Sequence, residues 1–166
     1  VLVNNAGGFP ERRGIDDMTL ADWQSTIALN LTSVFLVTQA LLGLLRRSGR
    51  GRIINIGSLS GQTTGWNTSP AYAAAKAGVH SLTRVLAGEL APEGITVNAL
   101  APSAVLTDRI RALRDEEELA RTARSVPLGR YQTPDEVATW VLFLADAEPG
   151  FMTGQTISVN GGRFMY

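Results

Sequence analysis

Short apolar runs alternate with longer helical patterns along this chain of 166 residues, and that alternation limits its fold more than any other feature. Four runs are predicted to be strands: Val1–Val3, Arg52–Gly57, Ile95–Leu100 and Thr156–Val159. The second of them is rich in apolar β-branched residues, as expected for a strand that is buried on both faces. Strands that alternate with helices usually form a parallel sheet. We therefore expect an α/β fold with four parallel strands flanked by helices.

Two long helices are predicted, at 20–47 and 70–91. Thr19 is a suitable N-cap for the first, because Asp22 follows three residues later where an acid interacts well with the helix dipole. Pro70 suits the first turn of the second, where its missing N–H costs nothing. Between them, the region around Trp66 is predicted to be a polar loop that either flanks a substrate or covers the site.

The C-terminal third carries two further helical patterns. Residues 108–125 are charged and helical in pattern, and their run of four acids is typical of a solvated face rather than of a metal site. The other helix begins at Pro134, after the N-cap Thr133. It is expected to turn four apolar residues inward, namely Val137, Val141, Leu142 and Leu144.

The composition excludes several classes of function. Fifteen basic residues balance fifteen acidic ones, so neither nucleic acid nor an anionic membrane is an expected partner. The chain has no cysteine, which excludes disulfides and iron–sulfur clusters. Its single histidine, His80, cannot make a metal cluster. No apolar run approaches the roughly 20 residues that a membrane span needs. We expect one domain covering residues 1–166, in a cytoplasmic protein without a membrane partner.

Tyr72-Ala-Ala-Ala-Lys76 is the stretch with the clearest chemical meaning. Residues four apart lie on one face of a helix, so the phenol and the ammonium are expected side by side. A nearby cation favours the phenolate, and the pair could then act as a general acid/base near neutral pH. The alternative is an ordinary amphipathic helix with a half-buried Tyr and a surface Lys. His80, one turn beyond Lys76, is interpreted as a packing or surface histidine.

Other polar residues follow predicted strands. Ser58 follows the second strand, at the edge where open α/β sheets bind ligands, although it could equally be a turn serine. Asn5, Ala6 and Gly7 follow the first strand, where small residues let a ligand approach the backbone or simply form a tight turn. Asn30 lies inside a helical pattern, where it could be a tolerated polar residue with a local backbone bond.

These motifs, in this order and together with Asn160-Gly161-Gly162, resemble those of the short-chain dehydrogenase/reductase family. The resemblance extends from Val1 to about Gly162 and is strongest to the branch of bacterial 3-oxoacyl-(acyl-carrier-protein) reductases. It implies a Rossmann-type sheet and hydride transfer between NAD or NADP and a small alcohol or carbonyl substrate. It also implies a homo-oligomer that pairs through the helices at 20–47 and 70–91.

The resemblance assigns roles to individual residues. Tyr72 would be the general acid/base, Lys76 would lower its pKa and bind the ribose, and Ser58 would polarise the carbonyl. Asn30 would anchor a water through a kinked backbone. The residues implied at the cofactor are Asn5, Ala6, Gly7, Tyr72, Lys76, Pro102, Ser103, Val105 and Thr107. The family usually has glycine where Ser103 stands. The serine side chain is therefore expected to narrow the space for the nicotinamide.

The glycine-rich phosphate loop and the ribose-selecting residue of the family have no match here. The sequence therefore resembles the C-terminal two-thirds of a family member, and the choice between NAD and NADP is left open. An unpaired sheet edge would favour aggregation or oligomerisation. Two other interpretations stay open: a non-catalytic association module with this fold, and a dehydratase or epimerase that uses the same Tyr and Lys.

Overall fold

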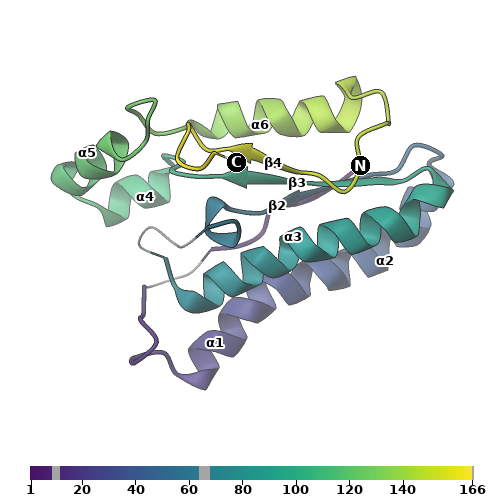
Figure 1. Ribbon diagram of the computed structural model, residues 1–166. Coiled ribbons are helices and arrows are strands. Elements are labelled where there is room, and N and C mark those ends of the chain that lie inside the picture. Colours follow the sequence, from purple (N-terminus) through teal and green to yellow (C-terminus); the bar gives the residue numbers. More distant parts are fainter. Residues whose placement is uncertain (9–11, 64–67, 166) are drawn as a thin grey trace.

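The computed structural model of the chain describes residues 1–8, 12–63 and 68–165, and contains one parallel sheet in the order β1-β2-β3-β4 (Figure 1). The strands are β1 Leu2–Asn4, β2 Arg52–Ile56, β3 Thr96–Pro102 and β4 Thr156–Val159. Among the described strands β1 pairs only with β2, so it forms one edge of the sheet. The expected four-stranded parallel sheet is confirmed.

Helices cover both faces of this sheet (Figure 1). On one face lie α1 Leu20–Ile27, a π turn η1 at Ala28–Thr32, α2 Ser33–Arg47 and α3 Pro70–Leu90. On the other face lie α6 Pro134–Leu142 and a second π turn, η4, at Phe143–Ala147. Two short helices, α4 Asp108–Leu113 and α5 Glu116–Arg124, lie beyond the carboxyl ends of the strands. Single 3-10 turns complete the list: η2 Leu59–Gly61 and η3 Ala91–Glu93.

Two apolar clusters hold the layers together, one on each face of the sheet. Ile53 belongs to the cluster under α2 and α3, whereas its neighbour Ile54 belongs to the cluster under α6. Consecutive side chains of a strand point to opposite faces, so β2 contributes to both clusters. Each isoleucine is 1% exposed, which confirms that this strand is buried on both faces.

The helix starts were predicted better than the helix interiors. Thr19 and Thr133 both form capping boxes, with Asp22 and Glu136 respectively. The helix expected at 20–47 is interrupted by the π turn η1. Leu142 was expected to point inward and is 68% exposed, so that prediction is wrong. It lies about 100° around the helix from Val141, which packs on the core.

The expectation that no run is long and apolar enough to span a membrane is also wrong. The helical stretch Leu20–Arg47 passes that test by length and composition. In the structure this stretch packs against α3 and β1, with Val34 and Leu45 in the core. It also leaves an exposed apolar surface, which includes Phe35 at 47% and Leu36 at 52% exposure.

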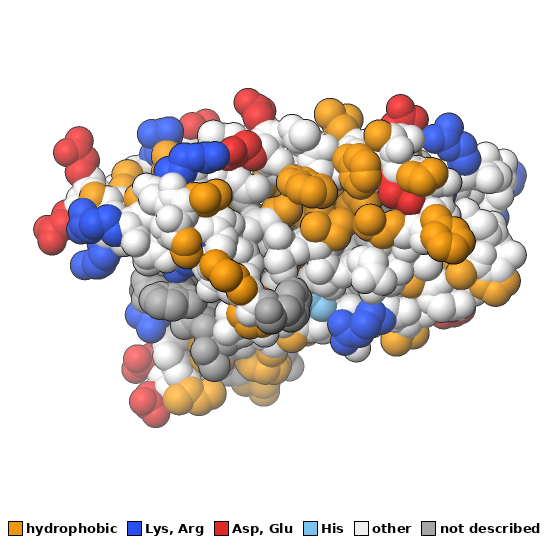
Figure 2. Space-filling model, turned by 45° about the horizontal axis from the view of Figure 1, so that its top comes forward, with side chains coloured by type: hydrophobic (Ala, Val, Ile, Leu, Met, Phe, Trp, Pro, Cys, Tyr) orange, Lys and Arg blue, Asp and Glu red, His pale blue; other side chains and the backbone are white. Residues whose placement is uncertain are grey.

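A second apolar surface lies over α6. Figure 2 looks onto this side of the molecule, where hydrophobic side chains gather over α6 and the segment that follows it. The rings of Trp140 and Phe143 meet edge to face there with centroids 6.1 Å apart, and Phe151 is 96% exposed. The molecule therefore has apolar surfaces on both helical layers.

Candidate active site

The fold brings Ser58, Tyr72 and Lys76 together at the carboxyl end of β2. Ser58 follows the strand directly and caps η2, and its side chain is hydrogen-bonded to that of Tyr72 on α3. One turn further along α3, the Lys76 ammonium lies 5.7 Å from the centre of the Tyr72 ring. The proximity predicted from the four-residue spacing is therefore observed.

Burial dominates the electrostatics of this group. Lys76 is 3% exposed, its Nζ donates to the Ile56 carbonyl at 2.7 Å, and burial lowers its pKa to about 8. Burial raises the pKa of Tyr72, and the hydrogen bond with Ser58 opposes that rise. We expected Lys76 to lower the pKa of Tyr72, and the structure does not bear this out. The Lys76 ammonium is directed to the Ile56 carbonyl, and desolvation of the Tyr72 phenol has the largest effect on the pKa of that phenol.

Asn30 is fully buried in the π turn that separates α1 from α2. Its Oδ1 accepts from the Gly8 N–H at 2.8 Å, and its Nδ2 donates to the carbonyls of Gly8 at 2.8 Å and Thr26 at 2.9 Å. π turns are rare and occur often at functional sites. The irregular backbone that the resemblance implied at Asn30 is present, and the side chain ties it to the loop after β1.

Gly7 lies between Asn30 and Lys76. A Cβ atom at this position would be 2.7 Å from Asn30 Oδ1 and 3.2 Å from Lys76 Nζ, which is too close for any side chain to fit without displacing them. Asn5, Ala6 and Gly7 are themselves exposed, so their backbone is open to a ligand. All four predicted catalytic residues therefore gather around the ends of β1 and β2.

Asn4 is a structural residue that the sequence reasoning missed. It is 8% exposed, and its Nδ2 donates to Asn55 Oδ1 at 2.8 Å and to Thr38 Oγ1 at 3.2 Å. Asn55 in turn donates to Thr83 Oγ1 at 2.9 Å. This buried chain of side chains joins β1 and β2 to α2 and α3. The sequence signal that could have revealed this role is the polar residue in each of two adjacent apolar strands, Asn4 in β1 and Asn55 in β2.

His80 also has a larger role than its sequence context indicated. It is 4% exposed, and its Nε2 accepts from the Ser58 N–H at 3.4 Å. The ring is hydrogen-bonded to the backbone of Gly61 as well. Burial lowers the pKa of His80 to about 4, so the ring is neutral and keeps Nε2 free to accept. His80 thus packs against both ends of the loop that carries Ser58.

A cavity of about 630 Å³ opens beside Ser58 and Tyr72. Ser103 and Val105, from the segment after β3, also line it. Pro102 is buried at the end of β3, and Thr107 caps α4 by accepting from the Ile110 N–H at 3.3 Å. Neither Pro102 nor Thr107 is among the residues that line this cavity. Trp66 lies outside the described residues.

This arrangement suits acid/base chemistry on a substrate oxygen. A phenol and a hydroxyl share a cavity wall, and a buried ammonium lies behind the phenol. Lys76 has no carboxylate partner among the described residues, and an ammonium has two further donors beyond the one used by Ile56. The backbone at 5–7 is exposed, so the hydroxyl groups of a ribose can approach it from solvent. The residues present therefore fit the nicotinamide half of a dinucleotide.

Comparison with known proteins places the chain in one family. The sequence profile of the family described as Enoyl-(Acyl carrier protein) reductase matches residues 1–163. The chain is 43% identical over 165 residues to a 3-oxoacyl-(acyl-carrier-protein) reductase of Vibrio cholerae, which covers 99% of this chain and 66% of that protein. It is 44% identical over 164 residues to an acetoacetyl-CoA reductase of Rhizobium meliloti, covering 99% and 67% of the two chains.

A solved structure agrees with these sequence relatives. The crystal structure of a 3-oxoacyl-(acyl-carrier-protein) reductase with bound NAD from Brucella melitensis superposes with a TM-score of 0.89 at 34% identity. The match covers 99% of this chain and 62% of that one, so the chain spans about two thirds of the length of such relatives. The profile match, the sequence identities and the shared fold together establish that the chain belongs to the short-chain dehydrogenase/reductase family.

Proposed function

We propose that the protein is an NAD(P)-dependent oxidoreductase that acts on an alcohol or carbonyl compound. The observation that carries the proposal is the pair Tyr72 and Ser58 on the wall of one cavity, with the buried Lys76 ammonium 5.7 Å from the centre of the Tyr72 ring. The names of the relatives support it, since they are reductases of 3-oxoacyl and acetoacetyl compounds. The relative that was solved with NAD supports the cofactor class.

The roles of the residues follow from their chemistry. Tyr72 donates its phenolic proton to the carbonyl oxygen during reduction and takes it back during oxidation. Ser58 donates a hydrogen bond to the same oxygen and polarises the carbonyl. Lys76 offers its remaining ammonium N–H groups to ribose hydroxyls, and Asn30 holds the loop at Gly7 and Gly8 in place. The nicotinamide cofactor, when bound, supplies or accepts the hydride.

The cofactor residues after β3 are part of the same proposal. Ser103 and Val105 lie on the cavity wall and would border the nicotinamide. Pro102 fixes the turn that leads to them, and Thr107 would approach from the start of α4. Asn5 and Ala6 would border the adenosine half.

The test is oxidation of NADH and NADPH in the presence of a model ketone, measured on the protein expressed from its complete reading frame. We expect Tyr72→Phe to lower kcat at least a hundredfold, because general acid catalysis is worth about 10²–10⁴. Product analysis separates the alternatives. A dehydratase or epimerase would leave the reduced cofactor unconsumed, and a non-catalytic association module would not quench cofactor fluorescence even at millimolar concentration.

We also propose a soluble, cytoplasmic homo-oligomer that pairs through the helices at 20–47 and 70–91. The exposed apolar residues of these helices support the proposal, since large apolar patches on a soluble protein usually mark interfaces. They include Leu29, Phe35, Leu36, Leu44 and Val85. Light scattering of the wild type and of Leu36→Glu tests it. A monodisperse wild-type monomer would contradict the proposal.

A further inference from the structure

The wall of the active-site cavity is rich in hydroxyl groups. About half of the described residues that line it are serine, threonine or tyrosine. Its aliphatic members are Leu59, Ala104, Val105 and Ile110. Sites for apolar ligands are lined mostly by hydrophobic and aromatic side chains, with few polar groups. The composition of this wall therefore favours a ligand that carries several oxygen atoms over one that carries an alkyl chain.

Several of these hydroxyl groups already have partners inside the protein. Thr122 Oγ1 accepts from Arg114 at 3.1 Å, and Ser125 Oγ donates to the Thr122 carbonyl at 2.7 Å. Ser58 and Tyr72 are hydrogen-bonded to each other and are the groups assigned above to the reacting carbonyl. These bonds fix the wall, so a group that binds the rest of the substrate has to come from the other hydroxyls.

Two hydroxyl groups on this wall lack a partner. The Tyr131 hydroxyl and Thr68 Oγ1 are both buried, and neither has a hydrogen-bond partner among the described residues. Thr68 lies before α3 and Tyr131 before α6, and both residues line the cavity. Tyr131 interacts electrostatically with Arg163, but its hydroxyl makes no hydrogen bond there. Buried hydroxyls are normally hydrogen-bonded, so two unpaired ones at a single cavity indicate that a ligand completes them.

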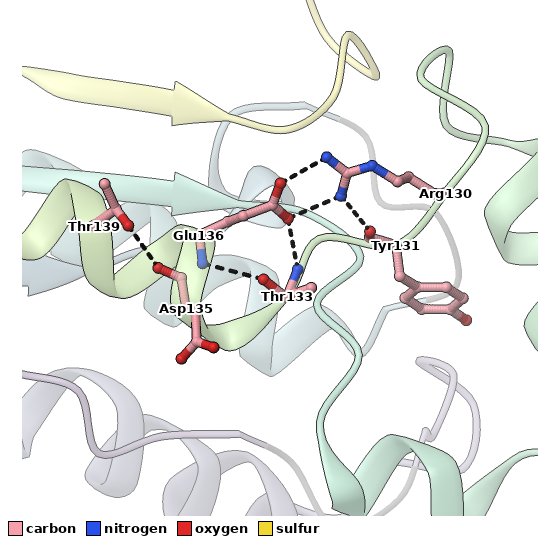
Figure 3. A network of polar contacts seen from close by, with 6 residues as sticks. All are labelled: Arg130, Tyr131, Thr133, Asp135, Glu136 and Thr139. Carbon is pink, nitrogen blue, oxygen red and sulfur yellow. Dashed lines mark hydrogen bonds and ion pairs between the residues drawn. The ribbon is translucent and has the colours of Figure 1, made fainter.

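The backbone around Tyr131 is held firmly at the cavity. The Gln132 N–H donates to the Ala104 carbonyl at 2.8 Å, which ties this segment to the loop after β3. The Tyr131 carbonyl accepts from Arg130, which also forms a double hydrogen bond with Glu136 at 2.6 and 2.9 Å. Figure 3 shows the Tyr131 ring directed away from this Arg130–Glu136 pair. The position of the ring is therefore set by its backbone, and its hydroxyl is left for a ligand.

We propose that this cavity selects a small ketone that carries hydroxyl groups, which Tyr131 and Thr68 bind while the carbonyl faces Tyr72 and Ser58. This inference rests on the proposed oxidoreductase function. A hydroxyl group both donates and accepts, so it can pair with a phenol or a threonine hydroxyl in either direction. An alkyl ketone would leave both protein hydroxyls without a partner. The substrate class is more polar than the 3-oxoacyl and acetoacetyl compounds named for the relatives.

A matched pair of ketones tests the inference: erythrulose, which carries hydroxyl groups, and 2-butanone, which has the same carbon skeleton without them. The measured quantity is the ratio of kcat/KM for erythrulose to that for 2-butanone. We expect the wild type to favour erythrulose at least a hundredfold, because a site built to bind a hydroxyl rejects an analogue that lacks it. Tyr131→Phe and Thr68→Val should each lower the ratio at least tenfold. Thr139→Val, at an exposed threonine of α6 outside the cavity lining, should leave the ratio unchanged.

The thermal stability of the same variants separates ligand binding from a structural role. Tyr131→Phe removes a hydroxyl that has no hydrogen-bond partner within the described residues, so the Tm should stay unchanged or rise. A Tm below that of the wild type would show that the hydroxyl is bonded inside the protein, and that result would overturn the inference.

Binding without turnover separates the two proposals. In saturation-transfer NMR, erythrulose should receive more saturation from the wild type than 2-butanone does, and Tyr131→Phe should remove the difference. If this happens and neither ketone is reduced, the oxidoreductase proposal fails while the hydroxyl-binding site stands. If both ketones are reduced and neither Tyr131→Phe nor Thr68→Val changes the ratio, the inference is overturned and the oxidoreductase proposal stands. Absence of both turnover and the NMR difference overturns the inference too.

Discussion

Gly57 lies directly against the imidazole of His80: a Cβ atom at position 57 would be 2.2 Å from Nε2 and 2.9 Å from the Leu100 carbonyl oxygen. No side chain fits there unless the ring or the backbone of β3 moves. The strand end that presents Ser58 is therefore packed against helix α3 through a histidine. The next turn of the loop also packs closely on α3, since a Cβ at Gly61 would lie 2.6 Å from the Lys76 backbone.

Gly57→Ala should lower the free energy of unfolding by about 1–3 kcal/mol, because overpacking in a rigid interior forces neighbours to shift. Urea unfolding measures it. Gly88→Ala is the matched control, since Gly88 is exposed inside α3 with nothing within 4 Å of a built Cβ. Alanine there should stabilise the protein by about 0.5–1 kcal/mol. Equal stability of Gly57→Ala and the wild type would show that His80 does not pack as described.

His80 should make the stability depend on pH in the acidic range. The folded chain keeps the ring neutral down to about pH 4, whereas the unfolded chain protonates it near its ordinary pKa of 6.5. The stabilisation is therefore complete above about pH 6.5 and is lost as the pH falls toward 4. The stabilisation lost over this range is on the order of 3 kcal/mol. Urea unfolding of the wild type and of His80→Gln between pH 7 and pH 4 gives the difference. Parallel curves for the two proteins would exclude this role.

Gly7→Ala should impair activity more than stability. The added methyl group would displace Asn30 Oδ1 or Lys76 Nζ, the two atoms nearest to it. We expect kcat/KM to fall at least tenfold, because small displacements of positioning groups cost large factors in rate. Gly14→Ala is the control, as nothing lies within 4 Å of a Cβ there. A Gly7→Ala variant with unchanged kcat/KM would argue against a functional place for Asn30 and Lys76.

The hydrogen bond between Ser58 and Tyr72 should be visible in the titration of the phenol. Burial raises the pKa of Tyr72 in the cofactor-free protein, and Ser58 partly offsets it. Ser58→Ala should therefore raise that pKa further. Ultraviolet difference titration, with Tyr72→Phe subtracted to isolate this tyrosine, measures both values. A lower pKa in Ser58→Ala than in the wild type would mean that the hydroxyl does not stabilise the phenolate.

The predictable part of this structure is the part encoded locally. The four strands, the capping boxes at Thr19 and Thr133, and the stacking of Tyr72 over Lys76 depend on residues a few positions apart. Periodicity and cap chemistry report such relationships directly. The position of Ser58 soon after a predicted strand also correctly predicted that it lies at the carboxyl end of that strand.

The unpredicted part depends on contacts between distant residues. The bond from Arg163 to Ser103 crosses 60 residues, and the one from Asn4 to Asn55 crosses 51. Nothing near either residue in the sequence marks its partner. The electrostatics failed for a similar reason: spacing placed Lys76 beside Tyr72, but the burial that raises the phenol pKa comes from the whole fold.

The π turn at Ala28–Thr32 sets a constraint on how this protein can change in length. Such a turn contains one residue more than a continuous α-helix would use. A single-residue deletion there would restore regular winding and remove the widened turn that places the Asn30 side chain against Gly8 and Thr26. The hydrogen bonds from Asn30 to the loop after β1 would then be lost, even though every remaining residue were unaltered. In this stretch a one-residue deletion should therefore be more damaging than most substitutions.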